Sequence, residues 1–81
     1  MRVDKFLNVV NITKRRAIAE DMCKSKAVSI NGLIVKPSKA VKIGDVITLH
    51  FTAGSENYKV LALPSGKSIP KNAQGEYVSR L

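Results

Sequence analysis

Acidic residues, aromatic rings and cysteine are all scarce in this chain of 81 residues. Six Asp and Glu stand against 14 Lys and Arg, which gives a formal net charge of +8. The single cysteine, Cys23, excludes a disulfide framework within the chain, so a reducing, cytoplasmic setting is expected. With two Phe, two Tyr and no Trp, the core needs most of the rings, and base stacking is not the expected mode of ligand binding.

Long hydrophobic runs are also missing. The apolar segments fall far short of the roughly 18 residues that a membrane-spanning helix requires. Asn8 and Asn11 interrupt the apolar stretch near the start, and no small-residue cleavage site follows, which argues against a signal peptide. We therefore expect no membrane partner, even though the strong positive charge would suit either an anionic membrane or a nucleic acid.

Two short helices are predicted at the start of the chain. Apolar side chains recur at i, i+3, i+4 and i+7, which is one helical face: Val3, Phe6, Leu7 and Val10. This spacing predicts a helix over 4–10, with Asp4 as its N-terminal cap or in its first turn. Thr13 is expected to cap a second helix over 14–25. The apolar stripe of that helix comprises Ile18, Ala19, Met22 and Cys23.

The remaining pattern alternates with a period of two and predicts an antiparallel sheet. Asn31-Gly32 separates apolar runs at 28–30 and 33–35, which is the strongest short hairpin signal. Further strands are expected over 46–51 and 58–63, with a turn over 53–57 between them. The sequence thus predicts one small α+β domain over 1–63, in which two helices pack on a small antiparallel sheet. Residues 64–81 are expected to form a poorly structured, basic tail containing Pro, Gly and Ser, with at most a short strand at 76–78.

The positive charge is concentrated in the first 42 residues. Ten cations there face three acids, a net charge of +7, whereas four cations face three acids in the remainder. Such an imbalance on the best-patterned part of a small domain indicates a polyanion-binding face.

The run Lys14-Arg15-Arg16 falls in the first turn of the predicted second helix. Cations are unfavourable there because the helix dipole is positive, so a bound phosphate would supply the missing anion. A solvated face is the alternative, in which Arg16 pairs with Glu20 for about 0.3–0.5 kcal/mol. Near the end of that helix, Lys24 and Lys26 are interpreted as structural, since cations are favourable there. The three-residue spacing of Lys36, Lys39 and Lys42 suggests a basic loop that extends the phosphate track.

Catalytic and metal-binding patterns are poor. His50 stands alone on the polar face of a strand, with no second ligand at metal-binding spacing. Cys23 is expected to be a core thiol rather than a nucleophile. We expect no enzyme activity, cofactor, metal or small-molecule substrate.

Five short strings resemble a known pattern: Met1-Arg2-Val3-Asp4-Lys5-Phe6-Leu7, Lys14-Arg15-Arg16-Ala17-Ile18-Ala19, Val28-Ser29-Ile30-Asn31-Gly32, Val35-Lys36-Pro37-Ser38 and Gly44-Asp45. In this order and spacing, over residues 1–51, they closely resemble the RNA-binding domain first named for ribosomal protein S-four, with its αL motif. Stand-alone chains of this length resemble the fifteen-kilodalton bacterial heat-shock RNA-binding proteins and the short ribosome-associated quality control factors P (RqcP).

The resemblance implies binding to ribosomal RNA and tRNA on large ribosomal subunits obstructed by a stranded nascent chain, in quality control or rescue. The RNA-contacting positions that it implies are Arg2, Lys5, Lys14, Arg15, Arg16, Lys36 and Lys39. It also implies that five residues hold the fold: Asp4, Asn31, Gly32, Gly44 and Asp45. The chain departs from the family pattern at Asn11, where a basic residue is common, and at Lys26, where glycine is usual.

Two other functions stay open. A DNA-binding helix-turn-helix protein would need base-reading side chains on the second helix, where Glu20 and Asp21 would repel the duplex. An RNA-binding appendage of an RNA-modifying enzyme, such as a pseudouridine synthase, would require a catalytic domain that 81 residues cannot hold. A monomer is the simplest expectation for oligomeric state.

Overall fold

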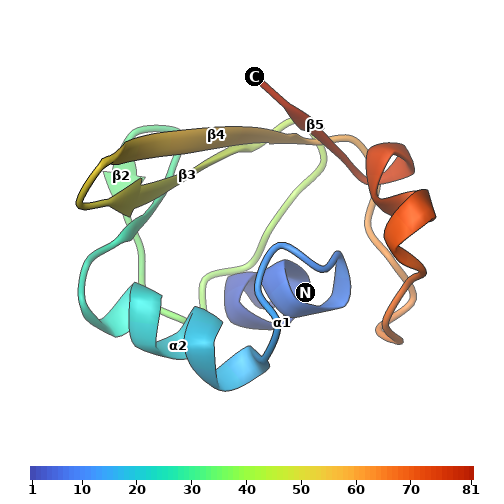
Figure 1. Ribbon diagram of the computed structural model, residues 1–81, viewed down its shortest axis with the longest axis horizontal. Helices are drawn as coiled ribbons and strands as arrows, with labels where there is room; N and C mark the ends of the chain where they lie inside the picture. Colours follow the sequence, from blue (N-terminus) through green and yellow to red (C-terminus); the bar gives the residue numbers. More distant parts are fainter.

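The computed structural model describes residues 1–81 and has two layers, helices on one side and a sheet on the other (Figure 1). The elements are α1 (Val3–Val9), α2 (Arg16–Lys24), β1 (Val28–Ile30), β2 (Leu33–Ile34), β3 (Val46–Phe51), β4 (Gly54–Val60), the 3₁₀ helix η1 (Lys71–Glu76) and β5 (Val78–Arg80). All strand pairs are antiparallel, in the order β2-β1-β3-β4-β5. The predicted α+β class is confirmed.

The core lies between the two layers. Ile47 and Leu49 alternate along β3 with the more polar Thr48 and His50, as a strand covered on one face requires. The two apolar side chains are almost fully buried and belong to one cluster with Phe6 of α1. Residues 3–10 supply three further members of that cluster, Val3, Leu7 and Val10, so α1 is the main helix of the core.

The Asn31-Gly32 hairpin signal is confirmed, and the end of α2 is capped even though lysine stands where glycine is usual. Asn31 and Gly32 have φ values of 51° and 84°, which is the type I′ turn that joins β1 to β2. At the end of α2, Lys26 has a φ of 64°, and its N–H bonds Cys23 O at 3.1 Å. The next N–H, of Ala27, reaches Met22 O at 2.8 Å, which completes a Schellman cap. Lysine thus occupies the left-handed position that glycine favours.

The predicted turn over 53–57 is wrong, because β4 already begins at Gly54. Gly54 pairs with Phe51, which leaves only residues 52 and 53 to connect the strands. The polar residues that suggested a turn instead form cross-strand bonds, as in the 2.7 Å bond from Thr48 Oγ1 to Asn57. The fourth strand therefore covers 54–60 rather than 58–63.

The expectation of a poorly structured tail is wrong for its second half. Residues 61–70 form neither helix nor strand, but η1 and β5 follow, and β5 pairs with β4 through Val60 and Val78. The short strand expected at 76–78 exists, two residues further on. Two long-range bonds fasten this segment to the end of α1: Asn11 Nδ2 donates to Ile69 O at 2.6 Å, and Gln74 Nε2 to Val10 O at 2.7 Å.

We predict that ending the chain after residue 63 destabilises the fold. Val78 is 4% exposed, and burying one valine contributes about 1.5–3 kcal/mol. Urea denaturation should therefore give an unfolding free energy lower by at least about 2 kcal/mol than that of the full chain. Leu81→Ala, at a residue that is 67% exposed, is the control and should change little. An unchanged midpoint for residues 1–63 would show that the tail contributes nothing to the domain.

A second prediction concerns Cys23, which lies in the core as expected. Burial raises the pKa of its thiol from 9.0 to about 11. The folded state therefore keeps the proton longer than the unfolded state, and the resulting stability is complete below pH 9 and lost towards pH 11. Cys23→Ala should flatten the fall in unfolding free energy over this interval, as measured by urea denaturation. Parallel pH profiles for both proteins would contradict this.

Candidate nucleic-acid interface

A buried carboxylate organises the N-terminal end of α1. Asp4 lies in the first turn of the helix and its side chain is fully buried. The segment that follows β2 closes over this turn: Val3 N–H donates to Lys39 O at 2.7 Å and Asp4 N–H to Pro37 O at 3.4 Å. The carboxylate also accepts the N–H of Lys5 at 2.7 Å. A buried charge needs partners of opposite sign, and the partners define the surface around it.

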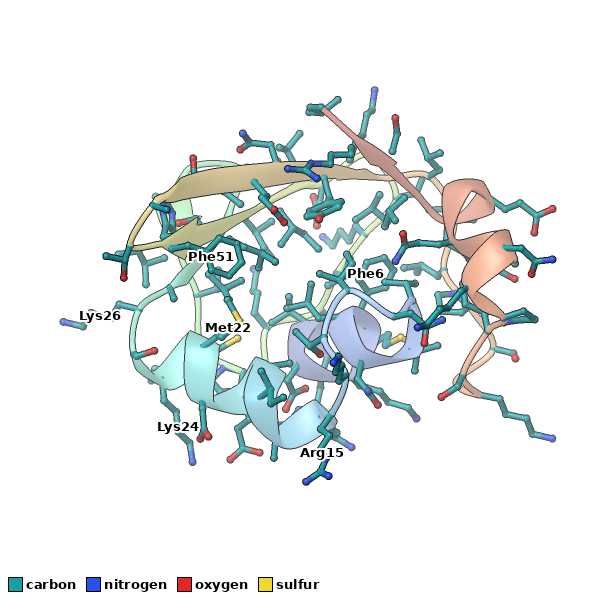
Figure 2. All side chains as sticks on the ribbon, viewed as in Figure 1. Phe6, Arg15, Met22, Lys24, Lys26 and Phe51 are labelled. Carbon is teal, nitrogen blue, oxygen red and sulfur yellow. The ribbon has the colours of Figure 1, made fainter.

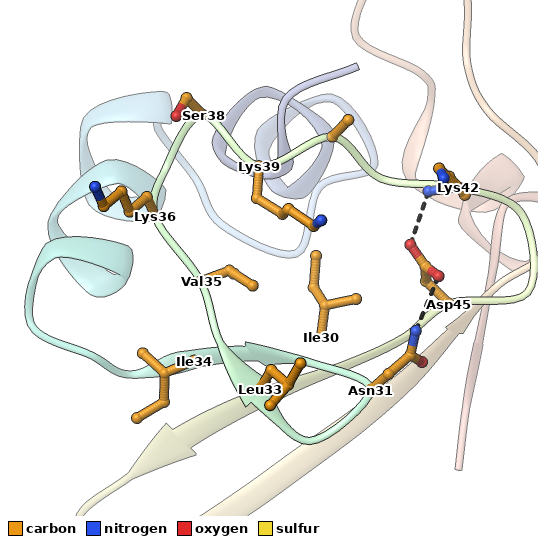
Figure 3. A pocket seen from close by; sticks show the side chains of 11 residues that line it. Ile30, Asn31, Leu33, Ile34, Val35, Lys36, Ser38, Lys39, Lys42 and Asp45 are labelled. Atoms are coloured by element: carbon orange, nitrogen blue, oxygen red, sulfur yellow. Dashed lines mark hydrogen bonds between the residues drawn. The ribbon is translucent and has the colours of Figure 1, made fainter.

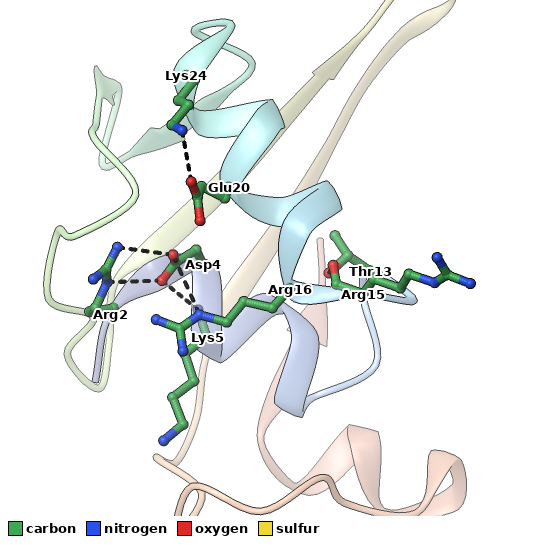
Figure 4. Close-up of polar contacts among 8 residues, drawn as sticks. All are labelled: Arg2, Asp4, Lys5, Thr13, Arg15, Arg16, Glu20 and Lys24. Carbon is green, nitrogen blue, oxygen red and sulfur yellow. Dashed lines mark hydrogen bonds and ion pairs between the residues drawn. The ribbon is translucent and has the colours of Figure 1, made fainter.

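Two arginines converge on this carboxylate (Figure 4). Arg2 binds it with both ends of its fork, Nε to Oδ1 at 3.2 Å and Nη2 to Oδ2 at 3.1 Å. Arg16 approaches from α2, with Nε 3.6 Å from Oδ2. The arginine side chains remain 48% and 47% exposed, so each guanidinium keeps donors that face solvent. Lys5 follows Asp4 in the chain and donates its backbone N–H to the same carboxylate, and we call Arg2, Asp4, Lys5 and Arg16 the Asp4 cluster.

The placement of Lys14-Arg15-Arg16 in the first turn of α2 is wrong for two of the three. The helix begins at Arg16, with Arg15 as its N-cap and Lys14 outside it. Thr13 is not the cap, because its Oγ1 donates to Arg15 O at 3.2 Å. Arg15 points away from the Asp4 cluster, and it does not lie along the core edge (Figure 4). The unfavourable charge at the helix start is therefore limited to Arg16, whose partner is a carboxylate of the protein.

The pair between Arg16 and Glu20, which the alternative of a solvated face required, is absent. Glu20 instead binds Lys24, with Oε1 and Nζ 2.7 Å apart. The hydrogen bond and charge of Lys24 lower the pKa of Glu20, and Glu20 raises the pKa of Lys24 in return. Lys24 thus has the structural partner that its position at the helix end suggested.

The basic loop after β2 lies beside α1, because Arg2 and Ala40 form an isolated antiparallel bridge. Lys36 lines a groove together with Arg2. Lys39 points instead toward Ile30, into a second hollow that Lys42 also lines (Figure 3). The structure therefore brings together four of the seven predicted contacts, Arg2, Lys5, Arg16 and Lys36. It leaves Lys14 exposed and turns Arg15 and Lys39 elsewhere.

Other chemistry has little support. No group of three or more His, Cys, Asp or Glu could hold a metal ion. His50 Nε2 lies 2.9 Å from the Ser29 hydroxyl, and Asp45 bonds Asn31 and the Lys42 backbone within the turn. No helix combines the length and apolar character needed to cross a membrane.

We predict that the Arg2–Asp4 pair is strongly coupled. The exposed pair of Arg80 and Glu56 has the same 3.1 Å separation, but its carboxylate is 33% exposed. A double-mutant cycle with Arg2→Ala and Asp4→Asn should give a coupling of about 1.5–3 kcal/mol in unfolding free energy. The matched cycle with Arg80→Ala and Glu56→Gln should give about 0.2–1 kcal/mol. Equal couplings would show that burial of Asp4 adds nothing.

Known proteins resemble this chain in both sequence and fold. The S4 domain family matches residues 1–47. The RQC P-site tRNA stabilizing factor of Helicobacter pylori is 48% identical over 79 residues, which are 98% of this chain and 94% of that protein. The factor of the same name from Bacillus subtilis is 45% identical over 51 residues, 63% of this chain and 59% of that protein.

Two solved structures share the whole fold. Vibrio cholerae Heat Shock Protein 15, described as trimeric, has a TM-score of 0.89 and 27% identity, covering 100% of this chain and 81% of that one. The solution structure of a hypothetical protein has a TM-score of 0.87 and 44% identity, covering 100% of this chain and 96% of that one. With family match, sequence and fold in agreement, this chain belongs to the S4 domain family, in the branch of the RQC P-site tRNA stabilizing factors.

Proposed function

We propose that this protein binds structured ribosomal RNA or tRNA through phosphate contacts on the Asp4 cluster and Lys36. Its place of action is the obstructed large ribosomal subunit in the cytoplasm, where it supports quality control by stabilising tRNA in the P site. The relatives named RQC P-site tRNA stabilizing factor support this role, since one of them matches almost the full chain.

The observation that carries the proposal is the pair of hydrogen bonds that the Arg2 guanidinium donates to the buried Asp4 carboxylate, with Arg16 beside the same carboxylate. An arginine held by one buried carboxylate loses less side-chain freedom when it binds a phosphate, because its position is already fixed. Its outer N–H groups can then bind two phosphate oxygens at once. The two arginines that pair with Asp4 leave a local charge of about +1, and Lys5, next in the chain, adds a further cation, which is the sign that attracts an RNA backbone.

A DNA-binding function has less support from the geometry. Helix α2 is nine residues long, and its N-terminal residue Arg16 faces Asp4. Glu20 and Asp21 lie in its middle, where a recognition helix needs donors for base edges. RNA helices are bound mainly through shape, phosphates and the 2′-hydroxyl, which requires no such readout.

The third alternative is an appendage of an RNA-modifying enzyme. The Helicobacter relative is matched over 94% of its own length, and its name describes a tRNA stabilizing factor. A separate binding protein without enzyme activity is therefore the reading we propose. We also propose a monomer, because a net charge of +8 opposes self-association, although the Vibrio neighbour is described as trimeric.

The test compares Arg16→Ala with Arg80→Ala, since each arginine pairs with a carboxylate and only Arg16 lies in the Asp4 cluster. Structured tRNA and ribosomal RNA fragments are titrated against duplex DNA of equal charge over a range of salt. We expect RNA preference in the wild type and an approximately tenfold loss for Arg16→Ala, with a salt slope smaller by about 0.7–0.9. Melting temperature should change little, because Arg2 still neutralises Asp4.

Two results would contradict the proposal. Equal affinity for RNA and DNA would leave only nonspecific polyanion binding. Equal losses for Arg16→Ala and Arg80→Ala would mean that overall charge, and not the Asp4 cluster, determines affinity.

A further inference from the structure

A groove runs between α2 and the segment that follows β2, next to the Asp4 cluster. It encloses about 560 Å³, within the range of about 300–1,000 Å³ typical of ligand sites. Its apolar lining includes Cys23, Val35 and Pro37. Arg2 belongs both to this groove and to the Asp4 cluster, so the two features form one continuous surface.

The rim of the groove is strongly cationic. Arg2, Lys24, Lys26 and Lys36 contribute to its lining. Its one glutamate, Glu20, is already bound to Lys24, and Figure 4 shows both side chains on the groove side of α2. The Ser38 hydroxyl lines the opposite wall and has no hydrogen-bond partner among the side chains of the protein. Lys26 and Lys36 have no carboxylate partner, and an apolar floor beside these two cations suits a flat ring flanked by anions.

We propose that this groove holds one unpaired nucleobase of the bound RNA, with Arg2, Lys26 and Lys36 on the phosphates at either side. The inference rests on the proposed RNA-binding function and specifies the kind of RNA: a stem that carries an extruded or looped-out nucleotide. Unpaired bases are the parts of RNA that proteins can reach, because the grooves of a paired helix hide the base edges.

The floor favours a base over a charged group. Burial keeps the Cys23 thiol protonated, because its pKa rises to about 11, so the floor is neutral and apolar at physiological pH. No aromatic side chain lines the groove, so the base packs on aliphatic surface and lysine stems. An acidic peptide with apolar side chains is the competing occupant of the groove. A peptide would leave the function of the neighbouring Asp4 cluster, whose arginine donors suit a phosphate, unexplained.

Lys26 supplies an independent argument. It occupies a left-handed backbone position, φ 64°, where a side chain is strained and glycine is preferred. From there it extends outward past the end of α2 (Figure 2). The helix dipole favours a cation there, but glycine would complete the same cap without backbone strain. Lys26 also lines one end of the groove, where its ammonium group can meet a phosphate.

The first experiment uses the wild-type protein and three RNA hairpins of equal length. One is fully paired, one has a single unpaired nucleotide (each of the four bases in turn), and one has an abasic site at that position. Fluorescence anisotropy should show about tenfold tighter binding to at least one unpaired base than to the other two RNAs. The abasic arm keeps the backbone phosphates, so it separates a base contact from a charge contact.

Two variants then locate the contact. Ser38→Trp should fill the groove and abolish the preference for the unpaired base while retaining binding to the paired hairpin. Ser68→Trp, at an exposed serine outside the groove, is the matched control and should keep the preference. Lys26→Gly should raise the melting temperature, since it relieves backbone strain, yet weaken RNA binding and reduce the salt slope by about 0.7–0.9. A purely structural Lys26 would change only the melting temperature.

The outcomes separate the two proposals. If the wild type binds none of the RNAs, the proposed function fails and this inference fails with it. If it binds all three hairpins equally, or if Ser38→Trp retains the preference, only the groove inference is overturned. A labelled peptide of alternating Glu and Leu serves as the further probe. Binding of that peptide, lost in Ser38→Trp and without any preference among the RNAs, would assign the groove to a protein ligand instead.

Discussion

The burial of one carboxylate is the constraint on which the functional surface depends. A buried carboxylate needs cationic partners, and Arg2 and Arg16 supply them to Asp4 from the starts of α1 and α2. Neither arginine needs to be buried for this purpose, so their outer donors stay available. The Arg2–Asp4 pair at the start of α1 and the Arg16–Asp4 pair that links α2 to α1 therefore fix the positions of the charges that we propose bind RNA.

Long-range contacts bring the rest of the surface into place. The segment after β2 binds the start of α1 through backbone bonds, which sets Lys36 beside Arg2. At the other end of α1, the C-terminal segment is fastened through Asn11, and β5 completes the sheet. The resemblance led us to expect a cation at Asn11, and the structure instead shows a structural use for its amide. The seven-residue helix α1 therefore contributes side chains to the core, carries Asp4 at one end and adjoins the C-terminal segment at the other.

The features that the sequence predicted correctly are those that follow from local rules. The Asn31-Gly32 turn requires only its own two residues, and the first helix follows from its apolar spacing. The start of α2 was mispredicted because Thr13 forms a local bond to Arg15 O instead of capping the helix. The extent of β4 was mispredicted because its polar residues pair across the sheet with β3, which no local pattern encodes. For the site, the charge imbalance and the residue types were evident. The convergence on Asp4 was not, because it depends on helix packing that no local pattern encodes.

The central proposal is that RNA contacts the arginines held by Asp4. The most direct measurement is an NMR titration that follows the Nε–Hε signals of Arg2, Arg16 and Arg80 while a structured tRNA or ribosomal RNA fragment is added. Large shifts for Arg2 and Arg16, with Arg80 unchanged, are the predicted result. Shifts confined to Arg80 and the uncovered face of the sheet would contradict the account, because RNA would then bind on the side away from the Asp4 cluster.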